Sequence, residues 1–161
     1  MDGSQPLAIY VNDHLMGASA GLELFRRAAG NHRGTPLGDA LERLTAEVER
    51  DREALLATAR DLGVTVRRYK LLAGWAAEKA GRLKPNGHLV TRAPLSDLVE
   101  LEGLRLGVQG KEAGWLSLRQ VAGRYPALDP AELDRLVARA RDQAAELEAL
   151  RQQCAAAVLT P

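Results

Sequence analysis

Apolar residues recur every three to four positions along most of the chain, which is the spacing of amphipathic helices. The pattern predicts four long helices over residues 6–29, 36–62, 95–123 and 129–158, and a shorter helix over 65–83. Thr35 before Pro36 and Asp129 before Pro130 are typical helix starts. Ser96 or Asp97 is expected to cap the helix over 95–123. No strand of useful length competes with these helices, so the chain is predicted to be all-α.

The connections between the long helices predict how they are arranged. Residues 30–35 and the stretch GRYPAL are short, so each joins two neighbouring helices into a hairpin. Residues 63–94 form a long crossover that carries the short helix. One long crossover resembles the ferritin-like four-helix bundle rather than a simple up-and-down bundle. We therefore expect residues 1–161 to form a single all-helical domain of the ferritin-like type.

Ferritin-like di-metal proteins hold their metals with glutamates and two Glu-x-x-His motifs. This chain lacks the motif, because none of His14, His32 and His88 has a glutamate three positions earlier. We therefore expect no metal centre and no cofactor. Stretches such as YVNDHLMGASAG, EKAGRLKPNG and LVELEGLRLGVQGK also resemble a group of actinobacterial-type proteins, and that resemblance implies no particular activity.

Three polar residues interrupt the apolar stripes at core positions of the long helices. They are Asp51, Lys111 and Gln143, and His14 borders the core side of the first helix. Counting from the hairpin turns puts all four near mid-helix. A lone buried charge is expensive, so Asp51 and Lys111 are expected to form a salt bridge that His14 and Gln143 support. Three alternatives stay open: one or more of these residues turn outward, they form a pocket for a small polar ligand, or they bind a metal.

Several small or apolar residues are expected to serve packing. Gly17 and Gly21 lie one turn apart, and glycine lowers helix propensity by up to ~1 kcal/mol per residue. We expect them to permit the close approach of a neighbouring helix. Trp115 is expected to pack in the core or at an interface, and Cys154 to be a small core residue.

Composition excludes several classes of protein. Apolar residues make up 46% and charged residues 27%, which is typical of a globular chain. The single cysteine excludes a disulfide framework and a multi-cysteine metal site. No uncharged run is long enough to span a bilayer, so we expect no membrane insertion. The N-terminal stretch MDGSQPLAIYVND lacks the basic region of a signal peptide, and a cytoplasmic location is therefore expected.

Charge is unevenly distributed, although the 22 basic and 21 acidic residues nearly balance. Residues 64–95 contain seven basic residues and one acidic residue. This excess is either a solvated face neutralised by the acidic second helix or a surface for an acidic protein or a small anionic ligand. The candidate basic surface consists of Arg67, Arg68, Lys70, Arg82 and Lys84. Few aromatic residues lie among them, so nucleic acid is the less expected partner.

These patterns favour a binding or protein-interaction module over an enzyme. One alternative is a degenerate ferritin-like metal-binding protein or oxidoreductase that uses carboxylates such as Glu47 and Asp51, which lie one turn apart. The other is binding of an anion or nucleic acid through residues 64–95. Apolar residues away from the main stripes, including Met16, Leu24 and Trp75, predict a homodimer.

Overall fold

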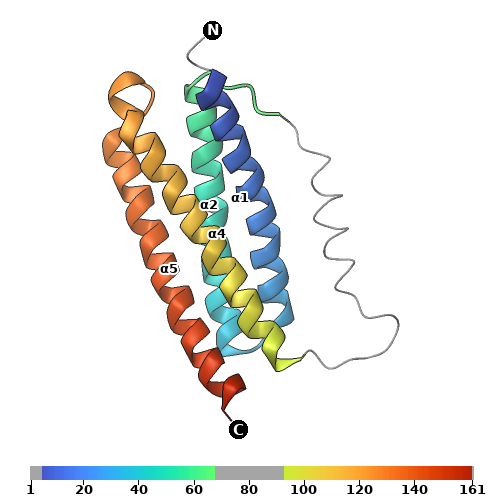
Figure 1. Ribbon diagram of the computed structural model, residues 1–161. Coiled ribbons are helices and arrows are strands. Elements are labelled where there is room, and N and C mark those ends of the chain that lie inside the picture. Colours follow the sequence, from blue (N-terminus) through green and yellow to red (C-terminus); the bar gives the residue numbers. More distant parts are fainter. Residues whose placement is uncertain (1–4, 68–92, 161) are drawn as a thin grey trace.

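The computed structural model describes residues 5–67 and 93–160, and these residues are helical nearly throughout (Figure 1). The long helices are α1 (Gln5–Asn31), α2 (Pro36–Asp61), α4 (Pro94–Val121) and α5 (Pro130–Leu159). A single 3₁₀ turn, η1 (Ala122–Arg124), follows α4. No strand occurs in the described ranges. The all-α prediction and the four long helices are therefore confirmed.

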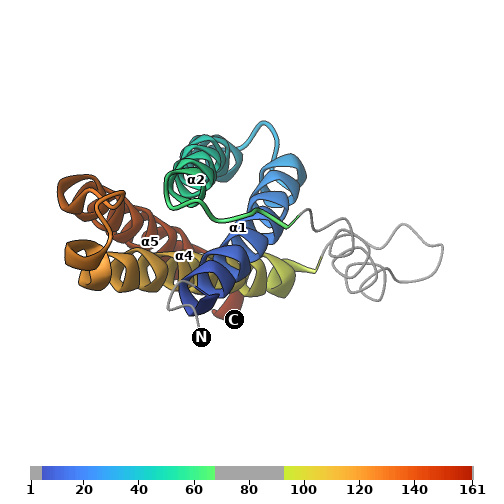
Figure 2. The ribbon, with the colours of Figure 1, turned by 90° about the horizontal axis from the view of Figure 1, so that it is seen from above.

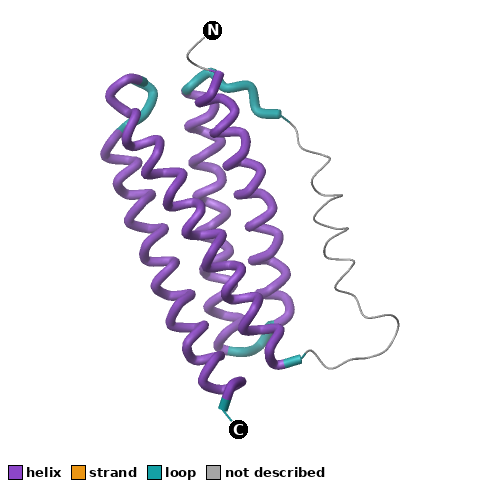
Figure 3. Tube along the Cα trace, viewed as in Figure 1, coloured by secondary structure: helices purple, strands orange, loops and turns teal. Residues whose placement is uncertain are grey.

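The helices form two hairpins that lie side by side (Figure 2). α1 packs along α2, and α4 packs along α5, whereas α1 with α4 and α2 with α5 meet less extensively. Loops lie at the ends of the helices (Figure 3). α2 ends near the start of α1, and α4 begins at the opposite end of the molecule (Figure 1). The connection between the two hairpins therefore has to run from one end of the helices to the other, as the crossover interpretation requires.

The predicted helix over 65–83 falls mostly outside the described residues. Its first three positions, 65–67, are not helical. The reason is the buried side chain of Asn12 on α1, which holds this part of the backbone. Asn12 donates to the carbonyl of Thr65 at 3.2 Å and accepts from the backbone N–H of Arg67 at 3.0 Å.

Two of the three predicted N-terminal helix caps are confirmed. Thr35 accepts a hydrogen bond from the backbone of Gly38, and Asp129 accepts one from Ala131. The prediction for α4 is wrong, because its N-cap is Ala93, which makes no side-chain cap. Pro94 fits the first helical position and starts α4 before Ser96 or Asp97 can cap it. Asp97 lies instead in the first turn, where its negative charge interacts favourably with the helix dipole.

Each long helix buries one apolar stripe in a common core. The largest fully buried side chains include Leu41, Leu44, Leu101 and Leu147, and Trp115 is buried as predicted. Cys154 lies half-buried at the edge of this core. None of the described helices combines the length and apolar character needed to cross a membrane.

Candidate functional site

The carboxylate of Asp51 is the centre of a buried polar network. Asp51 is 2% exposed and lies on the stripe of α2 between Val48 and Leu55. Lys111 of α4 donates to its Oδ2, and the guanidinium of Arg139 of α5 donates from Nε to its Oδ1 at 2.6 Å. Three helices therefore converge on one carboxylate, and the salt bridge predicted between Asp51 and Lys111 is present.

Gln143 of α5 completes the network. Its side chain is 1% exposed. Its Oε1 accepts from Lys111, and its Nε2 donates to Asp51 at 3.1 Å and to Glu47 at 3.0 Å. An amide can both donate and accept, so Gln143 serves the cation and both carboxylates at once. Buried polar atoms are thereby satisfied, which keeps the network in one arrangement.

Burial and neighbouring charge act in opposite directions on Lys111. Desolvation lowers the pKa of its ammonium, and the carboxylate of Asp51 partly offsets that effect. Arg139 also lowers the pKa of Lys111, because it places a second positive charge on the same carboxylate. The side chain of Arg139 is 37% exposed, so its guanidinium reaches the network from the surface.

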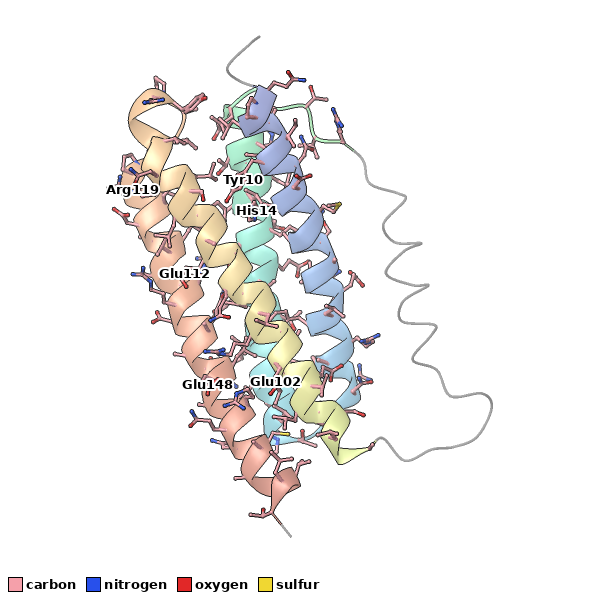
Figure 4. All side chains as sticks on the ribbon, viewed as in Figure 1. Tyr10, His14, Glu102, Glu112, Arg119 and Glu148 are labelled. Carbon is pink, nitrogen blue, oxygen red and sulfur yellow. The ribbon has the colours of Figure 1, made fainter. Side chains whose placement is uncertain are left out.

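His14 does not contact the salt bridge that it was predicted to support. Its ring lies 4.4 Å from the ring of Tyr10, on the side of α1 that faces α4 (Figure 4). Among the described residues, no hydrogen bond or ion pair joins His14 to Asp51, Lys111 or Gln143. Its ring fills the space beside Gly114, where an added Cβ would lie 2.8 Å from Nδ1. Burial lowers the pKa of His14, and Asp13 opposes that shift.

A cavity of about 390 Å³ lies between α1 and α4, next to the network. Most of its wall is apolar and includes Val11, Phe25, Leu55 and Trp115. Asp51 and Lys111 line it as well. Six glycines of α1 and α4 also line it: Gly17, Gly21, Gly103, Gly107, Gly110 and Gly114. Several of these are exposed, so the cavity opens to solvent between the two helices.

The predicted role of the α1 glycines is wrong. A Cβ added at Gly17 or Gly21 would meet nothing within 4 Å, so no neighbouring helix approaches there. The same holds on α4 for Gly103, Gly107 and Gly110. These glycines leave space open instead of permitting a close contact. Gly114, against which His14 packs, is the exception among the six.

Tyr10 and Ser117 join α1 to α4 at the end of the cavity where His14 lies. The hydroxyl of Tyr10 donates to Oγ of Ser117 at 2.8 Å, and Ser117 donates to the carbonyl of Ala113. Along the other side of α4, Arg119 and Glu112 pair with Asp134 and Arg141 of α5 (Figure 4). The α4–α5 hairpin is therefore held by its core and by surface ion pairs, while the α1–α4 side contains the cavity.

Of the five residues of the predicted basic surface, one lies within the described residues. Arg67 is exposed, and its backbone is held by Asn12. Arg68, Lys70, Arg82 and Lys84 lie outside the described residues.

A second titratable group lies at the far end of the molecule, away from the network. Ligand atoms of His32, Asp97 and Glu100 are within 4.8 Å of one another. Asp97 pairs with His32 at 3.4 Å, and Glu100 lies 4.0 Å from Arg27. The two acids lie in the first turns of α4, which has no side-chain cap, and the helix dipole stabilises negative charge there. The dipole and the pairs with His32 and Arg27 explain why these side chains lie close together.

No protein-family model, curated protein or solved structure matches this chain.

Sequence reasoning missed three residues of the site. Arg139 lies one turn before Gln143 on α5, and the same spacing relates Glu47 to Asp51 on α2. That regular offset is a signal by which Arg139 could have been found. Arg52 and Ser19, which meet beside the cavity, carry no such signal, because both lie on the polar margin of their helices.

Proposed function

We propose that this protein binds a small, mainly apolar molecule in the cavity between α1 and α4. The glycine-lined cavity carries the proposal. Five helical glycines have room for a side chain, and each lowers helix propensity by up to ~1 kcal/mol relative to alanine. Helix packing does not require glycine at these five positions, whereas an open binding site between the helices does.

The size and lining of the cavity support the same function. Ligand sites are typically concave, mainly apolar and ~300–1,000 Å³ in volume, with a few polar groups that orient the ligand. The cavity is about 390 Å³ and combines apolar walls with a small number of basic and acidic side chains. The network around Asp51 gives this part of the cavity wall a fixed shape, because Asp51, Lys111 and Gln143 each contact at least two other members of the network.

We further propose that the two hairpins form a ferritin-like four-helix bundle without a metal centre. The crossover between opposite ends supports this topology. Lys111 lies near the middle of its helix, where ferritin-like di-metal proteins have their metal ligands, and its ammonium would repel a metal cation. Elemental analysis of the purified protein is expected to find less than one equivalent of iron, manganese or zinc.

Binding of the neutral dye N-phenyl-1-naphthylamine tests the proposed function. The dye is expected to bind the wild type with saturable fluorescence enhancement. Gly107→Leu fills the cavity and is expected to weaken binding at least tenfold. Gly30→Leu is the matched control, because Gly30 is also helical, has free space around it and lies outside this cavity. Absence of saturable binding to the wild type, or equal binding by Gly107→Leu, would contradict the proposal.

A further inference from the structure

Arg52 is a half-buried cation in the wall of the cavity. Its Nε donates to Oγ of Ser19 at 3.0 Å, and Ser19 in turn donates to the carbonyl of Leu15. Within residues 5–67 and 93–160, no carboxylate lies within ion-pair distance of Arg52. By contrast, Arg26 and Arg119 each have an acidic partner. The guanidinium is therefore oriented by a hydroxyl and forms no ion pair with any described residue.

The other charged groups of the cavity do not compensate Arg52. Asp51 already accepts from Lys111, Arg139 and Gln143. Lys111 uses two of its three N–H donors on Asp51 and Gln143, so one donor remains.

The remaining titratable groups of the cavity lie on α1. His14 favours its neutral form, since burial lowers its pKa. Asp13 is exposed and raises the pKa of His14 without reaching ion-pair distance of any described cation. The lining of the cavity therefore contains two acidic and two basic residues. Of the two basic residues, Lys111 is paired with Asp51, whereas Arg52 has no acidic partner among the described residues.

We infer that the ligand is a small carboxylic acid whose carboxylate binds Arg52. This inference rests on the proposed function of the cavity. With Nε engaged by Ser19, both Nη groups remain to donate to the two oxygens of a carboxylate, the planar pairing that arginine favours. The free donor of Lys111 provides a second basic group in the same cavity. The apolar body of the acid lies against the glycine faces of α1 and α4.

Calorimetric titration of 2-naphthoate and of its methyl ester tests the inference. The wild type is expected to bind the acid at least tenfold more tightly than the ester, which has the same apolar body. Arg52→Gln is expected to abolish this preference, and Arg52→Lys to retain part of it, because lysine cannot form the paired contact. Arg50→Gln is the matched control, since Arg50 is an exposed arginine of α2 outside the cavity.

The neutral dye separates failure of the inference from failure of the proposed function. Arg52→Gln is expected to bind N-phenyl-1-naphthylamine as the wild type does. If the wild type binds the dye but does not distinguish acid from ester, the inference is overturned and the proposed function stands. Retention of the preference in Arg52→Gln also overturns it. If the dye does not bind the wild type, both proposals fail.

Discussion

Asp51 is a carboxylate at a position that neighbouring turns fill with valine and leucine. Burying a charge is costly unless partners replace water, and Lys111, Arg139 and Gln143 together do so. The three donors come from α4 and α5, so the carboxylate also ties the second hairpin to α2. Its contribution is best understood as fixing the register of the helices rather than as a large gain in stability.

Removal of Asp51 is expected to destabilise the protein strongly. Asp51→Leu leaves the ammonium of Lys111 with no carboxylate of its own, at an expected cost of about 3–5 kcal/mol in the free energy of unfolding. Lys111→Leu is expected to cost less, because Arg139 and Gln143 still donate to Asp51. The double leucine variant should recover much of the loss, since Arg139 is exposed enough to turn to solvent. Denaturant melts measure all three.

An exposed acid of the same helix serves as the control for this series. Glu53→Leu, two residues along α2, is expected to stay within about 0.5 kcal/mol of the wild type. If both single variants of the pair also stay within that range, the network does not stabilise the fold.

His14 is expected to make stability fall as the pH is lowered. Burial lowers its pKa in the folded state below the ordinary 6.5, although Asp13 opposes the shift. The unfolded chain therefore takes up the proton first, and protonation favours unfolding below about pH 6.5. Between pH 7.5 and 5.5 the wild type should lose more stability than His14→Gln. His32 and His88 are common to both proteins, so equal losses would show that His14 is not responsible.

At the scale of the helices, the apolar pattern predicts a great deal. Stripes on α2, α4 and α5 place Asp51, Lys111 and Gln143 at core positions, and counting from the hairpin turns brings them to one level. Contacts made from the polar margin of a helix are harder to predict. Arg139 and Arg52 reach inward along flexible side chains, and their positions in the sequence resemble those of ordinary solvated arginines.

The glycines show a similar limit of the sequence. A glycine pair one turn apart fits both a close helix contact and an open cavity, and the distance between helices decides which occurs. Gly38 does permit a close approach, but of the loop before its own helix and not of a neighbouring helix, because its missing side chain leaves room for the carbonyl of His32. The sequence contains no local difference that separates these cases.

Alanine substitutions at the glycines are therefore expected to have opposite effects on stability. Gly17→Ala and Gly107→Ala should each raise the free energy of unfolding by up to ~1 kcal/mol, since alanine favours the helix and nothing obstructs its methyl group. Gly38→Ala should lower it by about 1–3 kcal/mol, because its Cβ overlaps the backbone of His32. Urea unfolding of the three variants measures this. A loss of stability in Gly107→Ala would mean that the cavity is closed in solution.

At the scale of the whole molecule, the helices contact each other more extensively within each hairpin than between the two hairpins. Within each hairpin the helices pack along their length. Between the hairpins, the links include Tyr10 with Ser117, the network of Asp51 and an exposed pair of Arg43 with Glu146. A cavity between α1 and α4 is compatible with stability because the two helices of each hairpin stay packed against each other.

The exposed surface of α4 supports the expected homodimer. Leu95, Val99 and Leu106 recur at spacings of four and seven, which places them on one face of the helix, and each is more than half exposed. An apolar row of this kind on a surface helix is typical of a protein interface. Leu24 on α1 is also exposed, as the dimer prediction assumes.

We expect light scattering at micromolar concentration to give the mass of a dimer for the wild type. Leu106→Glu places a charge in the middle of the apolar row and should shift the protein to the monomer, because burying an unpaired carboxylate at the interface is costly. Leu159→Glu is the matched control: Leu159 is 66% exposed, as Leu106 is, but lies at the end of α5. A monomeric wild type would contradict the prediction, and a dimer that survives Leu106→Glu would place the interface on another face.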